Sequence, residues 1–455
     1  MWPRTLRFGQ VLLLGLVVRL ALAPLGGHTF DTYVWYDTGQ RVFAGQPFYG
    51  VTMYSYPPTW AAVLGVVDAV YRPLAASLGA HPLTAPQVLQ IMGRPFILGS
   101  PLLADWLFLL LVKLPLIAGD LALGLVLRRI VALRLSEPAL ADRAFAWYFL
   151  NPYVIWISAV WGMFDVLPTL FALVGILLFL DRRDALSGIA FGVAVSLKYF
   201  PVLLALAILV AYRGSLTRER LLRFGAGFLL VLGGVSLPFL LGNAGAYVRG
   251  VLSPTSGANV GRVSVWGLLD SVGIGNVPLA LAATDIVVTV VLVALFAALR
   301  GRRPQASTVP TLWIETGIVS LAVFYVLNYS VNPQYFIWIV PFFILDAVRP
   351  SRRPWALMVV SALVLLYIVT GVQHYSFFLP IITISPGLAP YVLPMPDLPV
   401  FMGGVGVVVW VAMLAVMIQR VSRAGGQPAI RRVLQEVRGT LRLGRRQAPE
   451  DPGSR

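Results

Sequence analysis

The sequence predicts an all-α polytopic membrane protein, a bundle of about twelve transmembrane helices with a large first extracytoplasmic loop that carries short juxtamembrane helices. Hydrophobic residues make up 58% of the 455 residues and charged residues only 12%, whereas roughly a quarter of a soluble protein is charged. The apolar residues fall into separate runs divided by arginine clusters. This favours helices, because each span must satisfy its own backbone hydrogen bonds, and the alternating pattern of a membrane barrel does not occur.

The positive charge is distributed as expected for a membrane protein. The formal net charge is +16, and most of the 35 Lys and Arg lie at the termini and in loops between apolar runs. Such a bias marks cytoplasmic loops. We therefore expect a multi-pass protein of the cell membrane with both termini cytoplasmic and no nucleic-acid partner. The lack of cysteine excludes disulfides and thiolate metal sites.

The first span is predicted over residues 8–25. The sequence Ala21-Leu22-Ala23 resembles a signal-peptidase site, but Pro24 follows directly and Arg19 interrupts the apolar core. We therefore expect this segment to be retained as a helix.

Residues 26–104 are predicted to form the large outer loop, which contains the catalytic region. The apolar run 57–70 is short for a span and suits a juxtamembrane helix. The number of membrane crossings supports this choice. The arginines after Leu127 should be cytoplasmic, which requires only one further crossing after the first span. One span over 105–127 then returns the chain to the cytoplasm.

The later spans form pairs that return to arginine-rich loops. The four runs between 144 and 212 are short, so their outer turns should dip below the membrane surface, where irregular backbone is tolerated if it lines a cavity. A single transmembrane domain, 1–419, precedes a basic tail, 420–455, in which 430–443 is predicted as a cationic amphipathic helix. The predicted later spans are 144–158, 166–180, 185–197, 201–212, 224–241, 277–299, 309–328, one that ends before Arg349, 355–374 and 400–418.

Polar residues gather in the part of the chain that we assign to the outer half of the membrane. A charge at bilayer depth costs roughly 2.5 to 3.5 kcal/mol and normally faces a partner or a cavity. We therefore treat these residues as candidates for substrate binding or catalysis. They are Asp31, Asp37, Lys113, Asp120, Asp165, Lys198, Arg249, Arg262, Gln334, Tyr335 and His374.

The two lysines of the chain each have a structural alternative. Lys113 and Asp120 are seven residues apart on one helix face, and in the simpler interpretation they offset each other or join helices. Lys198 closes a hairpin too short to reach water easily, which favours phosphate binding over a side chain that extends to the membrane surface.

Asp31 and Asp37 are the candidates for catalysis. A carboxylate that takes a proton from a sugar hydroxyl is a plausible general base. Their spacing of six residues does not place them on one helix face. The alternative is that Thr29 or Asp31 is an N-cap at the start of a helix.

The order of the motifs resembles that of the GT-C superfamily of membrane glycosyltransferases, and most closely the GPI mannosyltransferase I catalytic subunit and prokaryotic polyprenyl-phosphate-mannose-dependent mannosyltransferases. The resemblance runs from about Asp31 to Pro341. Its motifs are Asp31, Asp37, Gly45, Tyr49, Tyr54-Ser55-Tyr56-Pro57-Pro58, Lys113, Asp120, Leu150-Asn151-Pro152, Asp165, Lys198-Tyr199-Phe200-Pro201 and Gln334-Tyr335-Phe336-Ile337-Trp338.

The resemblance implies an inverting sugar transfer on the outer face from a polyprenyl-phosphate donor to a lipid or glycan acceptor. It implies that Asp31 is the base and that Lys198, with the adjacent Tyr199, and Gln334-Tyr335 line the donor site. Relatives often have an acid-x-acid motif where this chain has Thr29-Phe30-Asp31, so we expect neither a metal nor another cofactor.

Other candidate residues have proposed roles toward the substrates. Arg249 or Arg262 pairs with the donor phosphate, since guanidinium binds phosphate well, and His374 orients the acceptor. The main alternative function is a lipid or solute transporter with the same polar chamber, and a noncatalytic scaffold is a third. The sequence identifies no protein partner.

Overall fold

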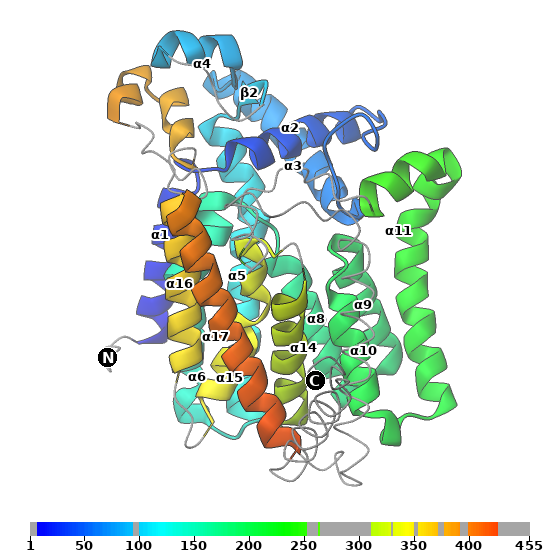
Figure 1. The fold of residues 1–455 in the computed structure, drawn as a ribbon. Coiled ribbons are helices and arrows are strands. Elements are labelled where there is room, and N and C mark those ends of the chain that lie inside the picture. Colours follow the sequence, from blue (N-terminus) through cyan, green and yellow to red (C-terminus); the bar gives the residue numbers. More distant parts are fainter. Residues whose placement is uncertain are drawn as a thin grey trace, which may run out of the picture.

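A computed structural model of the chain describes residues 7–93, 100–252, 263, 311–328, 331–349, 354–371, 377–391 and 399–425. This part is mostly helical, with a bundle of tall helices covered at one end by shorter ones (Figure 1). Among the described residues, four helices are long and apolar enough to cross a membrane: Pro58–Leu78, Trp106–Leu133, Arg218–Val251 and Gly403–Arg420. The structure thus supports an all-α membrane protein, while the number of twelve spans stays a prediction. Span 277–299 and helix 430–443 lie outside the described residues.

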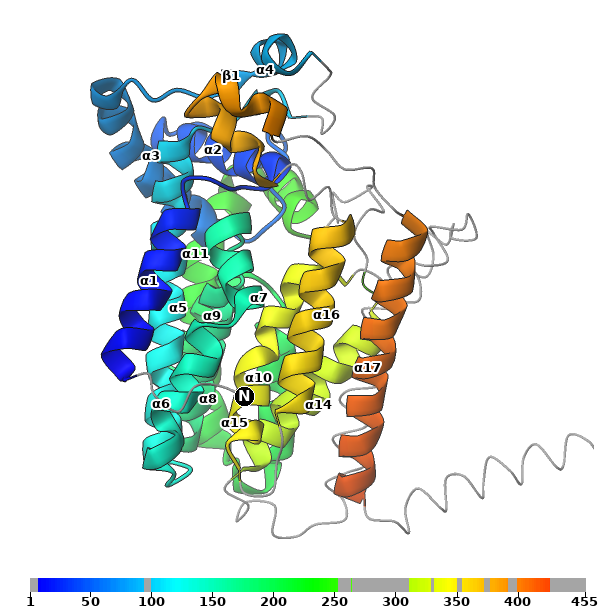
Figure 2. The same cartoon turned by 90° about the vertical axis from the view of Figure 1, so that its left-hand side faces the viewer.

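The shorter helices form a layer that we call the cap. Two segments far apart in the sequence, the first outer loop and residues 377–391, meet in it (Figures 1 and 2). Val88, Leu103, Leu379 and Ile382 are buried together between them. The cap consists of α2 (Thr29–Phe43), α3 (Pro58–Leu78), α4 (Ala85–Met92), the 3₁₀ helices η6 (Leu379–Thr383) and η7 (Pro386–Tyr391), and a two-stranded antiparallel ladder of β1 (Leu83–Thr84) and β2 (Leu102–Leu103).

Helix α3 differs from the short helix predicted over 57–70, because it continues to Leu78. Its 21 residues give it the length and composition of a span, yet it lies in the cap beside α2 (Figure 1).

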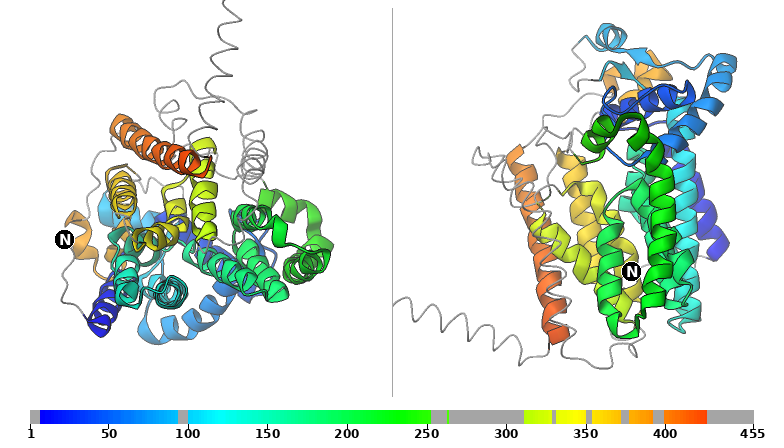
Figure 3. Two further views of the ribbon diagram at one scale, coloured as in Figure 1. Left: turned by 90° about the horizontal axis from the view of Figure 1, so that it is seen from below. Right: turned by 90° about the vertical axis from the view of Figure 1, so that its right-hand side faces the viewer.

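Most of the predicted spans correspond to helices of the bundle. Helices α8, α9 and α10 begin and end within one residue of the predicted 166–180, 185–197 and 201–212. In the view from below, α9 to α11 lie on one side and α16 and α17 on another (Figure 3). The bundle helices are α1 (Phe8–Leu22), α5 (Trp106–Leu133), α6 (Pro138–Phe149), α8 (Val166–Leu180), α9 (Asp184–Leu197), α10 (Pro201–Ala211), α11 (Arg218–Leu252), α14 (Leu312–Leu327), α15 (Val340–Ala347), α16 (Trp355–Gly371) and α17 (Pro399–Gly425).

Helices α9 and α11 approach closely because small residues face each other. A Cβ at Gly188 would lie 2.0 Å from the Phe224 carbonyl oxygen, and one at Gly227 would lie 2.2 Å from that of Ala185. Small residues allow this kind of backbone packing in membranes, where water supplies no hydrophobic drive between helices.

The predicted span 144–158 is divided into three pieces. Helix α6 ends at Phe149, α7 (Pro152–Ile155) follows, and the π-helix η1 (Trp156–Trp161) completes the segment. Pro152 has no N–H to continue the helical ladder, and Asn151 starts the new helix by accepting from the Tyr153 N–H at 3.0 Å. The segment turns at Gly162, whose φ of 87° is the left-handed conformation that glycine favours.

Buried polar groups connect the helices throughout the bundle. The Arg19 Nε donates to Asp120 Oδ2 at 2.9 Å, and Tyr148 and Ser158 also donate to Asp120. Lys113 instead donates to three backbone carbonyls: those of Ala23 and Gly26, which follow α1, and that of Val160 in η1. Lys113 and Asp120 therefore do not offset each other, but each joins α5 to other segments, as the second part of the structural alternative predicted.

Buried ion pairs also occur at the arginine-rich end. Arg220 donates from two nitrogens to Asp184, and Arg420 pairs with Asp346 and Glu315. The sequence placed the important polar groups mainly on the outer side. The structure shows buried charges at both ends, and those at the arginine-rich end form ion pairs between helices.

Candidate active site

A buried ion pair lies beneath the cap where α9 ends and α8 begins. The Lys198 Nζ lies 2.8 and 2.9 Å from the two oxygens of Asp165. Lys198 follows the last residue of α9, and Asp165 precedes the first residue of α8. Both side chains are at most 2% exposed. The two turns that the sequence places 33 residues apart therefore share one pair of charges.

The segment 333–338, from the other half of the chain, packs against this ion pair. It forms the 3₁₀ helix η4 (Pro333–Trp338), and the Trp338 Nε1 donates to Asp165 at 2.7 Å. Phe200 stacks on Trp338 with ring centroids 3.6 Å apart and planes 3° apart. Asp165 thus accepts from both a lysine and an indole.

Aromatic rings surround the Lys198 ammonium. The nearest is Tyr335, whose centroid is 4.6 Å from Nζ, and the others are Tyr56, Phe164 and Trp338 at 5.2 to 5.7 Å. Each such contact favours a cation by about 0.5 to 2 kcal/mol, more where water is excluded. The rings and Asp165 together stabilise a charge in an apolar region.

Asp31 lies near this pair, in the first turn of α2. Its Oδ2 accepts from the Trp161 Nε1 at 2.8 Å and lies 3.0 Å from the His28 Nδ1. The His28 ring packs between Trp161 and Phe377, with centroids 5.5 Å from each. The Asp31 side chain is 17% exposed. Asp31 is thus more accessible than Asp165, whose side chain is fully buried.

The environment of Asp31 keeps it ionised. Burial alone would raise its pKa, but the charge of and hydrogen bonding to His28, the Trp161 N–H and the charge of Lys198 together lower the pKa below its ordinary value. Asp31 therefore stays a carboxylate down to unusually low pH. Lys198 is the most weakly acting of these groups, and its positive charge contributes in the same direction as His28.

Tyr56 connects the two parts of the site. Its pKa is raised well above the ordinary value, chiefly by burial and then by Tyr335, Asp31 and Asp165. The charges of Asp31 and Asp165 thus both favour the neutral phenol of Tyr56. We call Asp31, His28, Tyr56, Trp161, Asp165, Lys198, Tyr335 and Trp338 the cap site.

The other predicted catalytic residue, Asp37, does not join the cap site. It pairs with Arg41 one turn along α2, at 3.1 Å. The N-cap of α2 is His28, whose side chain makes no capping bond. The N-cap alternative for Thr29 and Asp31 is therefore wrong, and Asp31 bonds across to Trp161 instead.

The remaining predicted substrate-binding residues are dispersed. Gln334 is buried, and no described residue bonds its Oε1. Tyr199 is 53% exposed next to Lys198, and Arg249 is exposed near the end of α11. Lys113 has its three carbonyl partners below the cap. Arg262 and His374 lie outside the described residues.

Four members of the cap site were not predicted as site residues: His28, Tyr56, Trp161 and Trp338. Of these, Tyr56 and Trp338 stand in motifs that carry the resemblance. All four stand in or next to predicted outer loops and turns. Aromatic residues are common at membrane surfaces, so the sequence alone did not distinguish site residues from residues that contact the membrane surface.

The arrangement defines a class: a helical membrane protein with an ionised, partly exposed carboxylate beside a lysine–aspartate pair in an aromatic setting. Among the described residues, no group of three His, Cys, Asp or Glu is placed to hold a metal ion. The absence of a metal remains a prediction.

Comparison with known proteins gives one finding for part of the chain. Residues 98–250, about a third of the sequence, match the family model described as GPI transamidase subunit PIG-U. The match includes Asp165 and Lys198 but neither Asp31 nor Tyr335. No curated protein matches the chain. The resemblance to GPI mannosyltransferase I stays a prediction.

The Lys198–Asp165 pair can be tested by a double-mutant cycle. Lys198→Met or Asp165→Asn alone should lower the free energy of unfolding by about 3 to 5 kcal/mol, because each leaves one buried charge without its partner. The double variant should lose clearly less than the sum of the two, as measured by denaturation in detergent.

Asp181→Asn is the matched control, because Asp181 and its partner Arg134 are substantially exposed. It should change stability by less than about 1 kcal/mol. Additive losses at Lys198 and Asp165 would contradict the coupling.

Proposed function

We propose that the protein is a membrane glycosyltransferase that transfers a sugar, mannose as the resemblance implies, from a polyprenyl-phosphate donor to a lipid or glycan acceptor. The observation that carries this proposal is the Asp31 carboxylate. It is partly exposed, it is held ionised by His28 and Trp161, and it interacts with Lys198.

The acceptor hydroxyl would lose its proton to Asp31. A base must reach the proton that it removes, and the exposed part of the carboxylate is available to a hydroxyl. As the oxygen attacks the anomeric carbon of the donor, the bond to the phosphate breaks and the proton passes to Asp31. His28, 3.0 Å from Asp31, stabilises the carboxylate before this step.

The lipid phosphate would leave toward Lys198. Negative charge develops on the phosphate as the sugar departs, and a fixed positive group nearby stabilises that charge. Asp165 accepts two contacts from the Lys198 ammonium, which fixes the orientation of the lysine side chain. The rings of Tyr56 and Tyr335, which are only partly buried, offer apolar faces for the sugar or for the first isoprene units.

A second candidate function follows from the family match. PIG-U is described as a subunit of GPI transamidase, so this chain would be a noncatalytic subunit of a membrane complex that binds a glycolipid at the cap site. Such a subunit needs protein partners and has no transfer activity of its own.

The decisive assay uses purified full-length protein, a panel of radiolabelled polyprenyl-phosphate sugars and membrane lipid extracts. We expect a labelled product with wild type and a loss of at least about a hundredfold with Asp31→Asn, since general-base catalysis contributes about 10² to 10⁴. Asp31→Asn keeps the size of the side chain and its acceptor oxygen for Trp161.

Asp181→Asn again serves as the control and should retain activity. Near-normal transfer by Asp31→Asn would exclude Asp31 as the base. If wild type transfers no sugar from any donor but retains glycolipid in a pull-down, the subunit function is favoured instead.

A pH profile tests the role of His28. Asp31 has a lowered pKa, so it is active as a base above that pKa and loses activity when the pH falls through it. Burial raises the pKa of Asp31, and His28 is the group that lowers it most. In His28→Gln the pKa of Asp31 should therefore rise, and the acid limb of kcat/KM should move to higher pH. An unchanged acid limb, or one at lower pH, would show that His28 does not tune Asp31.

A further inference from the structure

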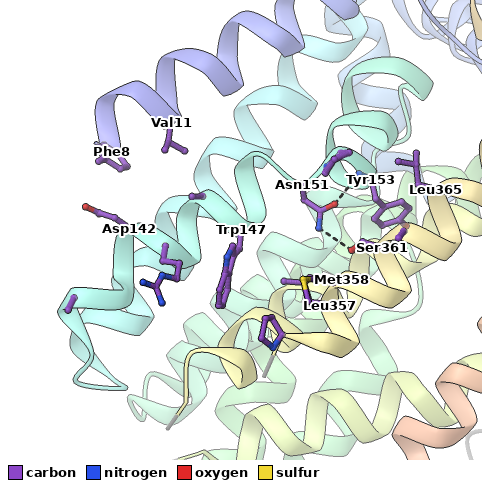
Figure 4. Close-up of a pocket in the computed structure, with 16 residues that line it drawn as sticks. Phe8, Val11, Asp142, Trp147, Asn151, Tyr153, Leu357, Met358, Ser361 and Leu365 are labelled. Atoms are coloured by element: carbon purple, nitrogen blue, oxygen red, sulfur yellow. Dashed lines mark hydrogen bonds between the residues drawn. The ribbon is translucent and has the colours of Figure 1, made fainter. Parts of the chain in front are cut away.

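A cavity of about 740 Å³ opens in the bundle between α1, α6 and α16 (Figure 4). Its volume falls within the range of small-molecule sites, roughly 300 to 1,000 Å³. It extends from the first turns of α6 to the break between α6 and α7, and none of the residues of the cap site line it. The cavity is therefore a separate feature.

The wall of the cavity is mainly apolar. It is formed by side chains from α1, α6, α7 and α16, and the Trp147 ring points into the space between α6 and α16 (Figure 4). The apolar lining residues are Phe8, Val11, Ala146, Leu357, Met358 and Leu365. Such a wall suits a hydrocarbon chain.

Polar groups at the inner part come from the helix break. Asn151 donates from Nδ2 to the Ser361 Oγ at 3.1 Å, and this bond joins α7 to α16 at the cavity wall (Figure 4). Both residues are at most 9% exposed. The break that ends α6 therefore also gives the cavity a hydrogen-bonding patch.

The charge at the entrance is positive. The Asp142 carboxylate accepts from the Arg128 Nε at 2.6 Å, and the Arg128 guanidinium lies 4.6 Å from the centre of the Phe8 ring. Arg128 therefore compensates Asp142. Arg143 also lines the cavity, it is exposed, and no described residue forms an ion pair with it. Among the described residues, the Arg143 guanidinium thus has no carboxylate partner.

We propose that this cavity binds one anionic phospholipid, with its phosphate on Arg143 and an acyl chain along the apolar wall. Guanidinium groups bind phosphate oxygens through paired, charge-assisted hydrogen bonds. A water-soluble anion would leave the apolar wall unused, and a zwitterionic lipid would not compensate the arginine. The first turns of α6 lie at the arginine-rich end of the bundle, where anionic lipids gather next to basic loops.

Native mass spectrometry of delipidated, full-length protein in detergent can test the site. Titration with phosphatidylglycerol should show one saturable bound lipid, and phosphatidylcholine should bind more weakly. Arg143→Gln should weaken phosphatidylglycerol about fivefold and weaken phosphatidylcholine less, because the choline charge already offsets its phosphate. Ala362→Phe should weaken both, because Ala362 lines the cavity and is exposed, so that the larger ring fills the space.

Arg223→Gln is the matched control, because Arg223 is 63% exposed near the start of α11 and does not line the cavity. It should bind both lipids as wild type does. Ala362→Leu provides a smaller filling variant if the phenylalanine variant unfolds, which thermal denaturation will reveal.

Equal binding of phosphatidylglycerol by wild type, Arg143→Gln and Ala362→Leu would overturn the proposal. So would binding of polyprenyl phosphate but not phosphatidylglycerol with the same dependence on Arg143, since the cavity would then be a donor-lipid site. The lipid site is independent of the sugar-transfer function, because its residues are separate from those of the cap site.

Discussion

The structure depends on the rule that a charge inside an apolar bundle must have a compensating partner. Lys198 is the clearest case. It would cost several kcal/mol alone at bilayer depth, and its contacts to Asp165 and to four aromatic rings offset that cost. These partners come from the ends of α8 and α9, from the cap and from η4. One buried ammonium thus fixes the relative positions of four segments of the chain.

The irregular backbone of the bundle occurs where it supports this arrangement. The segment from Asn151 to Gly162 leaves the α-helical ladder twice, and its last turn brings Trp161 beneath Asp31. A regular helix through the same residues would direct the indole elsewhere, since side chains follow the helical period. The same break contributes Asn151 to the cavity near the arginine-rich end. The cap site and the cavity therefore both depend on the irregular segment from Asn151 to Gly162.

The spans could be predicted from the sequence where apolar runs are bounded by arginine or proline. The predictions for α8, α9 and α10 are confirmed within one residue, because Asp184, Pro201 and the flanking arginines mark helix ends. The division of span 144–158 was missed, since Pro152 stands within a continuous apolar run. Helix α3 was predicted too short because Arg72 and Pro73 end the apolar run in the sequence, whereas in the structure Arg72 pairs with the buried Asp68 and the helix continues through Pro73.

The candidate site could be predicted only in part. Asp31, Asp165, Lys198 and Tyr335 were selected as polar or aromatic residues in outer turns, and the structure brings them together. Their pairing was not readable, because the partner of a buried charge is set by packing between segments distant in sequence. For the same reason Asp120 was assigned to Lys113 although its partner is Arg19.

The account treats Asp31 and Lys198 as two ends of one site for a lipid-linked sugar. The most direct measurement is a cryo-electron microscopy structure of the protein with a non-cleavable polyprenyl-phosphonate sugar. The account predicts the sugar next to Asp31 and the phosphonate next to Lys198. Density for the analogue at another place, with the cap site unchanged and without ligand, would contradict it.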